Sequence, residues 1–272
     1  MSALKKIWLF PGAALLCGIA GFGLRRWQLA VSFDEAGLPL PNTPPALLLV
    51  LLSAVVLAGS GVLGWRLCRE RERLGYGDAF RHPSPLFLTG HVLAAFLLLA
   101  AGGLSLFAFF RGDAASALPF SRITQAASGT LALVGGGCLL LLGRELNTDS
   151  PIKSSVPALL PVFAGCLWLV TLYQREAGNP VVAKYAYQIL AVAAIVLMLY
   201  FAASHSFENG RSERTLFACF AAVYFSCVAL ADIPLWHDLC LFGFGLVYGL
   251  VLSAALIHNL TAEREDTTHE PE

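Results

Sequence analysis

The sequence predicts an all-α integral membrane protein, a bundle of about eight transmembrane helices with both termini cytoplasmic. Of its 272 residues, 57% are hydrophobic and only 13% are charged, whereas soluble domains carry about 25% charged residues. The mean hydropathy is +0.69. Because so few charges cannot cover a globular surface, we expect the chain in a lipid bilayer, as a multi-pass protein of the cytoplasmic (plasma) membrane. The net charge is zero, which leaves no electrostatic case for binding nucleic acid.

Eight apolar runs are long enough to cross the hydrocarbon core, which takes about 20 residues. They comprise residues 7–24, 46–67, 86–110, 124–143, 156–173, 185–203, 215–231 and 235–257. The fourth run begins indistinctly at 121–125, and glycines at 135–137 lower its helix propensity, so its status as a full span stays open. We expect a single transmembrane domain over 1–260 and a disordered polar tail over 261–272.

The distribution of lysine and arginine predicts the orientation, since cytoplasmic loops retain these residues. With the N-terminus inside, twelve fall in inner segments and six in outer segments. Five of the twelve are arginines between Arg66 and Arg81, in the loop after the second run. The first run follows Lys5 and Lys6 and is too long for a typical signal peptide, so we expect it to be retained as a span.

His91 is the ionisable residue that lies well inside an apolar run. Ionisable groups at membrane depth are costly and therefore candidates for function. A neutral imidazole there could bind haem or contact a quinone, or it could be a hydrogen-bonded packing residue. No aspartate or glutamate lies in the middle of any run, which disfavours ion-coupled transport.

Polar residues gather on the outer rim, which is formed by the loops on the side opposite the termini. Segment 232–238 is the tightest turn in the chain and places two carboxylates and a histidine at the membrane boundary. Such a group could bind a cation or act as a general base, or the turn could be an interfacial loop with its tryptophan in the aromatic belt. The candidate ligand-binding residues on the rim are Arg25, Arg26, Gln28, Gln188, Asp232 and His237.

Catalytic and metal-binding motifs are not found. The seven cysteines form no CxxC pair, so we expect neither a disulfide framework nor a zinc site. We assign no catalytic residue and do not expect an enzyme. Gly245 and Gly249 form a GxxxG pattern, which permits close helix contact within the bundle or with another membrane subunit.

Three functions are compatible with these features. The first is a protein that binds or transports a small molecule without ion coupling, using the rim. The second is a redox membrane anchor that binds quinol or haem through His91. The number of spans and the shortage of intramembrane charge are similar to those of the membrane anchors of iron–sulfur oxidoreductases, although their quinol-site motif is not found. The third is a structural subunit of a membrane complex.

Overall fold

The computed structural model describes residues 3–34, 38–68, 74–82, 84–112, 119–147, 156–207, 210–232 and 234–267. Over these residues the chain is all α. The helices are α1 (Ala3–Val31), α2 (Pro44–Cys68), α3 (Tyr76–Phe80), α4 (Pro85–Arg111), α5 (Pro119–Leu146), α6 (Val156–Glu176), α7 (Val182–Ser204), the 3-10 helix η1 (His205–Phe207), α8 (Ser212–Leu230) and α9 (Trp236–Thr267). Eight of these are long and apolar enough to span a membrane, so the predicted multi-pass bundle is confirmed.

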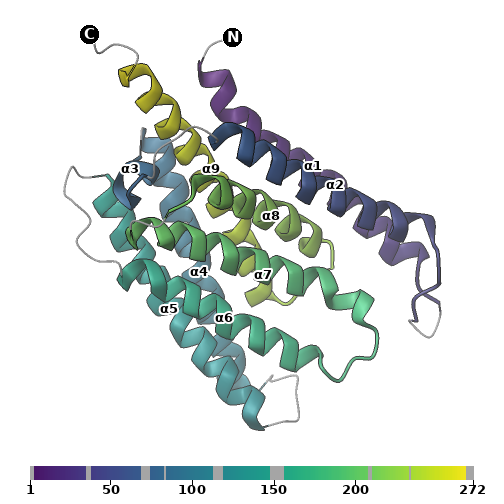
Figure 1. Ribbon diagram of the computed structural model, residues 1–272. Helices are drawn as coiled ribbons and strands as arrows, with labels where there is room; N and C mark the ends of the chain where they lie inside the picture. The colour runs from purple at the N-terminus through teal and green to yellow at the C-terminus, as the bar shows by residue number, and fades with distance from the viewer. Residues whose placement is uncertain are drawn as a thin grey trace.

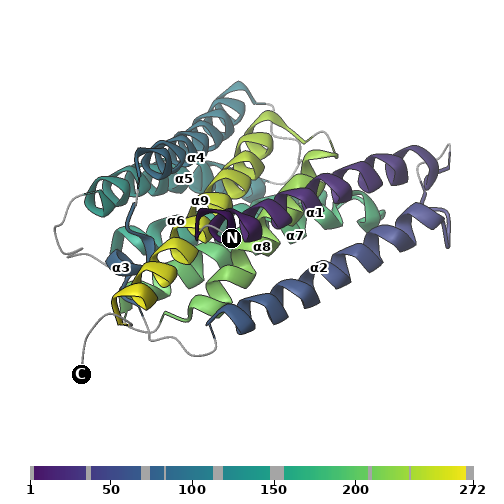
Figure 2. The ribbon, with the colours of Figure 1, turned by 90° about the horizontal axis from the view of Figure 1, so that it is seen from above.

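The long helices run up and down the bundle and leave both termini at the same end (Figure 1). Helix α8 lies at the centre, packed on α1, α2, α7 and α9, and 78% of its span is buried. Helix α2 lies at one edge of the bundle (Figure 2), where only 22% of its span is buried. Helices α4, α5 and α6 pack side by side, and α9 joins α4 to α8. We call the end opposite the termini the rim.

Close contact between α9 and its neighbours explains the GxxxG pattern. A Cβ atom on Gly245 would lie 2.5 Å from Ile195 Cδ1 of α7, and one on Gly249 would lie 2.8 Å from Val223 Cγ2 of α8. Real Cβ contacts are not that short, so glycine is what allows these helices to approach. This glycine face therefore packs within the bundle, which is the first of the two alternatives that the pattern permits.

Helix boundaries differ from the sequence prediction in three places. Helix α1 continues to Val31, so Arg25 and Arg26 belong to the helix and not to the loop after it. The short helix α3 was not anticipated, and its side chains Tyr76 and Phe80 are buried. Helix α9 continues to Thr267, into the segment expected as a tail, and residues 268–272 lie outside the described part. The fourth span, left open by the sequence, is by contrast long and apolar enough to cross a membrane, over the 25 residues Arg122–Leu146 of α5.

Candidate functional site

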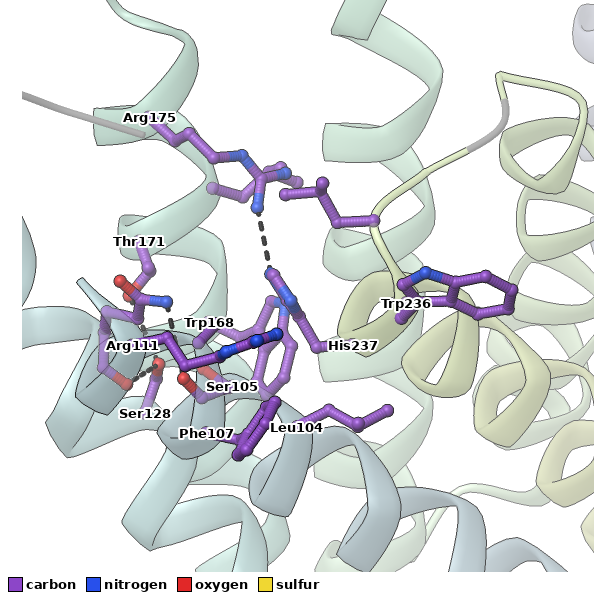
Figure 3. Close-up of a pocket in the computed structure, with 14 residues that line it drawn as sticks. Leu104, Ser105, Phe107, Arg111, Ser128, Trp168, Thr171, Arg175, Trp236 and His237 are labelled. Carbon is purple, nitrogen blue, oxygen red and sulfur yellow. Dashed lines mark hydrogen bonds between the residues drawn. The ribbon is translucent and has the colours of Figure 1, made fainter. Parts of the chain in front are cut away.

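A cavity of about 270 Å³ lies at the rim, between the ends of α4, α5 and α6 and the start of α9 (Figure 3). Its volume is close to the lower end of the range for small-molecule sites, about 300–1,000 Å³. The residues that line it are Leu104, Ser105, Phe107, Ala108, Arg111, Gln125, Ser128, Trp168, Thr171, Leu172, Arg175, Leu235, Trp236 and His237. The cavity thus combines apolar and polar side chains from four helices.

Two glycines set the position of the polar wall. A Cβ atom on Gly102 of α4 would lie 2.7 Å from the carbonyl oxygen of Gly129 on α5, so the two helices touch through backbone. One turn towards the rim, this close approach places Ser105 next to Gln125, whose Nε2 donates to the Ser105 carbonyl at 3.4 Å. Ser128 lies on the same face of α5 and is almost fully buried.

Two hydroxyl groups of this wall line the cavity. Thr171 Oγ1 donates to the carbonyl of Leu167 at 2.9 Å, with Ser128 Oγ as a more distant acceptor at 3.4 Å, and Ser128 Oγ donates to the carbonyl of Gln125 at 3.0 Å. A hydroxyl has one donor and two acceptor positions, so both oxygens keep acceptor capacity. Beside them the ring of Trp168, 3% exposed, and the side chain of Leu172 provide an apolar surface.

A buried carboxylate fixes the cationic side of the cavity. Asp238, in the first turn of α9, is fully buried. Its Oδ2 accepts a hydrogen bond from Arg175 Nη2 at 2.6 Å, and its Oδ1 accepts one from Trp168 Nε1 at 2.9 Å. Both groups come from α6, so the carboxylate ties α9 to α6. A buried tryptophan normally finds a partner for its N–H, which explains why Trp168 lies far from the helix ends where most other tryptophans lie.

The contact of His237 with Arg175 fits a neutral imidazole. Arg175 Nη1 lies 3.3 Å from His237 Nε2, and because a guanidinium can only donate, Nε2 is the acceptor and the ring proton is on Nδ1. The approach of His237 Nε2 to Asp238 Oδ2, at 3.8 Å, is therefore not an ion pair. Figure 3 shows His237 directed at Arg175, while Trp236 points away from it.

Four of the six predicted rim residues form a second cluster, outside the cavity. Arg25 of α1 is fully buried, and its Nε donates to Asp232 Oδ1 at 2.6 Å. Its Nη1 donates to Gln28 at 2.8 Å, and its Nη2 donates to the carbonyls of Ala183 and Lys184 at the start of α7. Arg25 thus links α1, α7 and the turn after α8, which is a structural arrangement with every donor nitrogen engaged.

Burial and hydrogen bonding have opposite effects on the pKa of Asp232. Burial raises the pKa of Asp232, while the Arg25 guanidinium and a contact with Gln188 counter the rise. Its Oδ2 makes no close hydrogen bond to a described residue. The fifth predicted residue, Arg26, is exposed and reaches only the Ala231 carbonyl at 3.4 Å. Of the six, only His237 lines the cavity.

His91 lies at the other end of α4 and is fully buried. Its Nε2 is 2.9 Å from the carbonyl of Leu139, so Nε2 donates and carries the ring proton. A Cβ atom on Gly143 would lie 2.8 Å from the ring, and Tyr248 packs edge-on against it. The ring thus makes one hydrogen bond and packs against its neighbours, while its buried Nδ1 has no hydrogen-bond partner among the described residues. Ligation of haem iron through Nε2 would require breaking the bond to Leu139. Among the described residues, no group of three metal-ligating side chains is found.

The six candidate rim residues do not include Arg111, Arg175, Trp168 or Asp238, although these define the cavity or its support. The sequence carries signals for them: Asp238 is one of the two carboxylates of the turn 232–238, both arginines lie at the outer ends of apolar runs, and Trp168 lies deep within one. A comparison of the chain with protein-family models, curated proteins and solved structures finds no match.

Proposed function

We propose that this multi-pass membrane protein binds a small amphipathic molecule in the rim cavity. The observation that carries the proposal is the cavity itself, which joins an apolar surface to convergent polar groups at the ends of four spans. Ligand sites are typically of this kind, mainly apolar with a few placed polar groups. The polar groups are also held in place, since Asp238 fixes Arg175 and Arg175 fixes His237.

The location of the cavity at the ends of the spans favours an amphipathic ligand over a fully polar one. Three apolar side chains are exposed at the edge of the cavity, with Phe107 57%, Leu235 49% and Trp236 76% exposed. They belong to the ends of spans, where a bilayer passes from hydrocarbon to head group. A molecule with a polar head and an apolar body matches this boundary on both sides.

The test uses the whole protein in phosphatidylcholine nanodiscs and three radiolabelled probes, dodecanoate, dodecanol and dodecylamine. Binding above that of empty nanodiscs is measured for the wild type and for Thr171→Trp, whose indole would fill the cavity. Val170→Trp is the matched control, because the neighbouring Val170 is 43% exposed on the outside of α6. We expect Thr171→Trp to lose the binding of at least one probe and Val170→Trp to retain it.

A second variant separates blockage from misfolding. Leu104, 37% exposed at the cavity edge, can be changed to tryptophan with little disturbance of the helix contacts. Equal binding of all three probes by the wild type, Thr171→Trp and Leu104→Trp, or no binding above empty nanodiscs, would refute the proposal. The structural-subunit alternative would then be favoured.

A further inference from the structure

The ionisable groups that line the cavity are all basic. They are Arg111, Arg175 and His237, and no aspartate or glutamate is among the lining residues. Glu176, whose Oε1 lies 3.4 Å from Arg175 Nε, is not among the described residues that line the cavity. Asp238 is fully buried behind Arg175 with both oxygens hydrogen-bonded. It therefore neutralises Arg175 and has no oxygen left for a ligand cation.

Arg111 is the cavity cation that lacks a carboxylate partner within the described residues. It is the last residue of α4 and exposed, and its guanidinium lies over the ring of Phe107, one turn back, at 5.2 Å from the ring centre. A cation at a helix C-terminus is favourable, but neither that location nor the ring uses its N–H donors. Figure 3 shows the side chain extending across the cavity.

Acidic groups are the natural partners of a guanidinium whose N–H donors have no partner in the described part of the chain, because its fork of N–H groups matches a carboxylate or phosphate. Leu104 and Phe107 lie on the same face of α4 as Arg111, at spacings i, i+3 and i+7, and together with Leu235 they form an apolar edge of the cavity lining. An acidic head at Arg111 would therefore place an attached chain along this edge, towards the bilayer. A cationic head would meet Arg111 and find no counter-charge.

We propose that the rim cavity takes an acidic amphiphile, whose head group pairs with Arg111 and whose chain lies against Leu104, Phe107 and Leu235. This inference rests on the proposed function and goes beyond it by naming the ligand class. The acid can be an anionic lipid of the bilayer or a free fatty acid, which share the same head-group chemistry at this position.

Binding of the three dodecyl probes tests the inference, at a pH where dodecanoate is ionised. We expect the wild type to bind dodecanoate more tightly than dodecanol or dodecylamine. Arg111→Gln should weaken dodecanoate binding about 10-fold or more, the size of a lost charge-assisted hydrogen bond, and leave dodecanol binding unchanged. Arg111→Lys should weaken it less, since it keeps the charge.

Arg122→Gln is the matched control. Arg122 is also exposed at the rim and lies over an aromatic ring, that of Phe109 at 5.5 Å, but it does not line the cavity. Its replacement should leave dodecanoate binding unchanged. An equal loss in both variants would assign the effect to the general charge of the rim and overturn the inference.

The outcomes separate this inference from the proposed function. Binding that Thr171→Trp abolishes but that does not distinguish dodecanoate from dodecylamine would keep the function and overturn the acidic ligand. Absence of any binding sensitive to Thr171→Trp would overturn both. Nanodiscs that contain phosphatidylglycerol identify the source: competition with dodecanoate in the wild type indicates a bilayer lipid, and no competition indicates the free acid.

Discussion

Arg25→Met is the substitution for which the structure gives the clearest energetic expectation. It removes the guanidinium and leaves Asp232, whose side chain is 3% exposed, as a buried charge without its counter-ion. Breaking a buried ion pair in this way costs about 3–5 kcal/mol. At about 1.4 kcal/mol per factor of ten, this corresponds to a rise of about 150- to 5,000-fold in the unfolding equilibrium constant.

The carbonyls of Ala183 and Lys184, which accept from Arg25 Nη2, lose a partner as well, so the upper part of this range is expected. Arg26→Met is the matched control in the next residue. Arg26 is exposed and makes one long hydrogen bond, and surface substitutions of this kind stay within about 0.5 kcal/mol. The same substitution at two neighbouring arginines is thus expected to cause very different losses of stability.

The assay is unfolding in mixed detergent micelles with increasing dodecyl sulfate, followed by tryptophan fluorescence. The double variant Arg25→Met with Asp232→Leu tests the cause, because replacing both partners of a buried pair by apolar residues is often neutral or stabilising. We expect it to recover most of the stability lost in Arg25→Met. Equal stability of Arg25→Met and Arg26→Met, or no recovery in the double variant, would refute the buried ion pair.

Two further predictions concern the opposite end and the core. Burial, with a smaller contribution from His91, lowers the pKa of His82 from 6.5 to about 4, so the unfolded state binds more protons between these values. Stability should fall as the pH drops from about 6.5 to about 4, and His82→Gln should flatten the curve of unfolding midpoint against pH; an unchanged curve would contradict this. Gly249→Ala should destabilise the protein by about 1–3 kcal/mol in the same unfolding assay, through overpacking against Val223. The control Gly103→Ala, with open space around the glycine, should be neutral or stabilising. Equal effects of the two substitutions would refute the close contact.

The spans could be predicted from the sequence because they depend on a local property, the length of each apolar run. The positions of most polar residues follow for the same reason, since charges are excluded from the hydrocarbon and collect at the ends of the runs. Helix ends were less predictable. The sequence predicts the end of the first span at residue 24, because two arginines follow it. Helix α1 continues past them, since α7 and the turn after α8 supply partners for Arg25 that a window along the sequence cannot reveal.

The sequence could not predict which rim residues line the cavity and which are buried around Arg25, for a related reason. Arg25 and Arg175 look alike as arginines at the ends of apolar runs. One is buried among four partners in a structural cluster, and the other lines a cavity. The difference arises from which helices pack together, α1 with α8 and α6 with α5, and these pairings depend on contacts between distant segments such as Gly102 with Gly129.

The turn between α8 and α9 connects the cluster around Arg25 to the cavity, and this connection helps to fix the positions of the cavity residues. Asp232, in the first part of the turn, is held by Arg25 of α1, and Asp238, in the first turn of α9, is held by Arg175 and Trp168 of α6. The cavity residues Leu235 and His237 lie between these two fixed points. Their positions are therefore set when the bundle folds, so a ligand need not order them, and preorganisation of this kind increases affinity by reducing the entropy lost on binding.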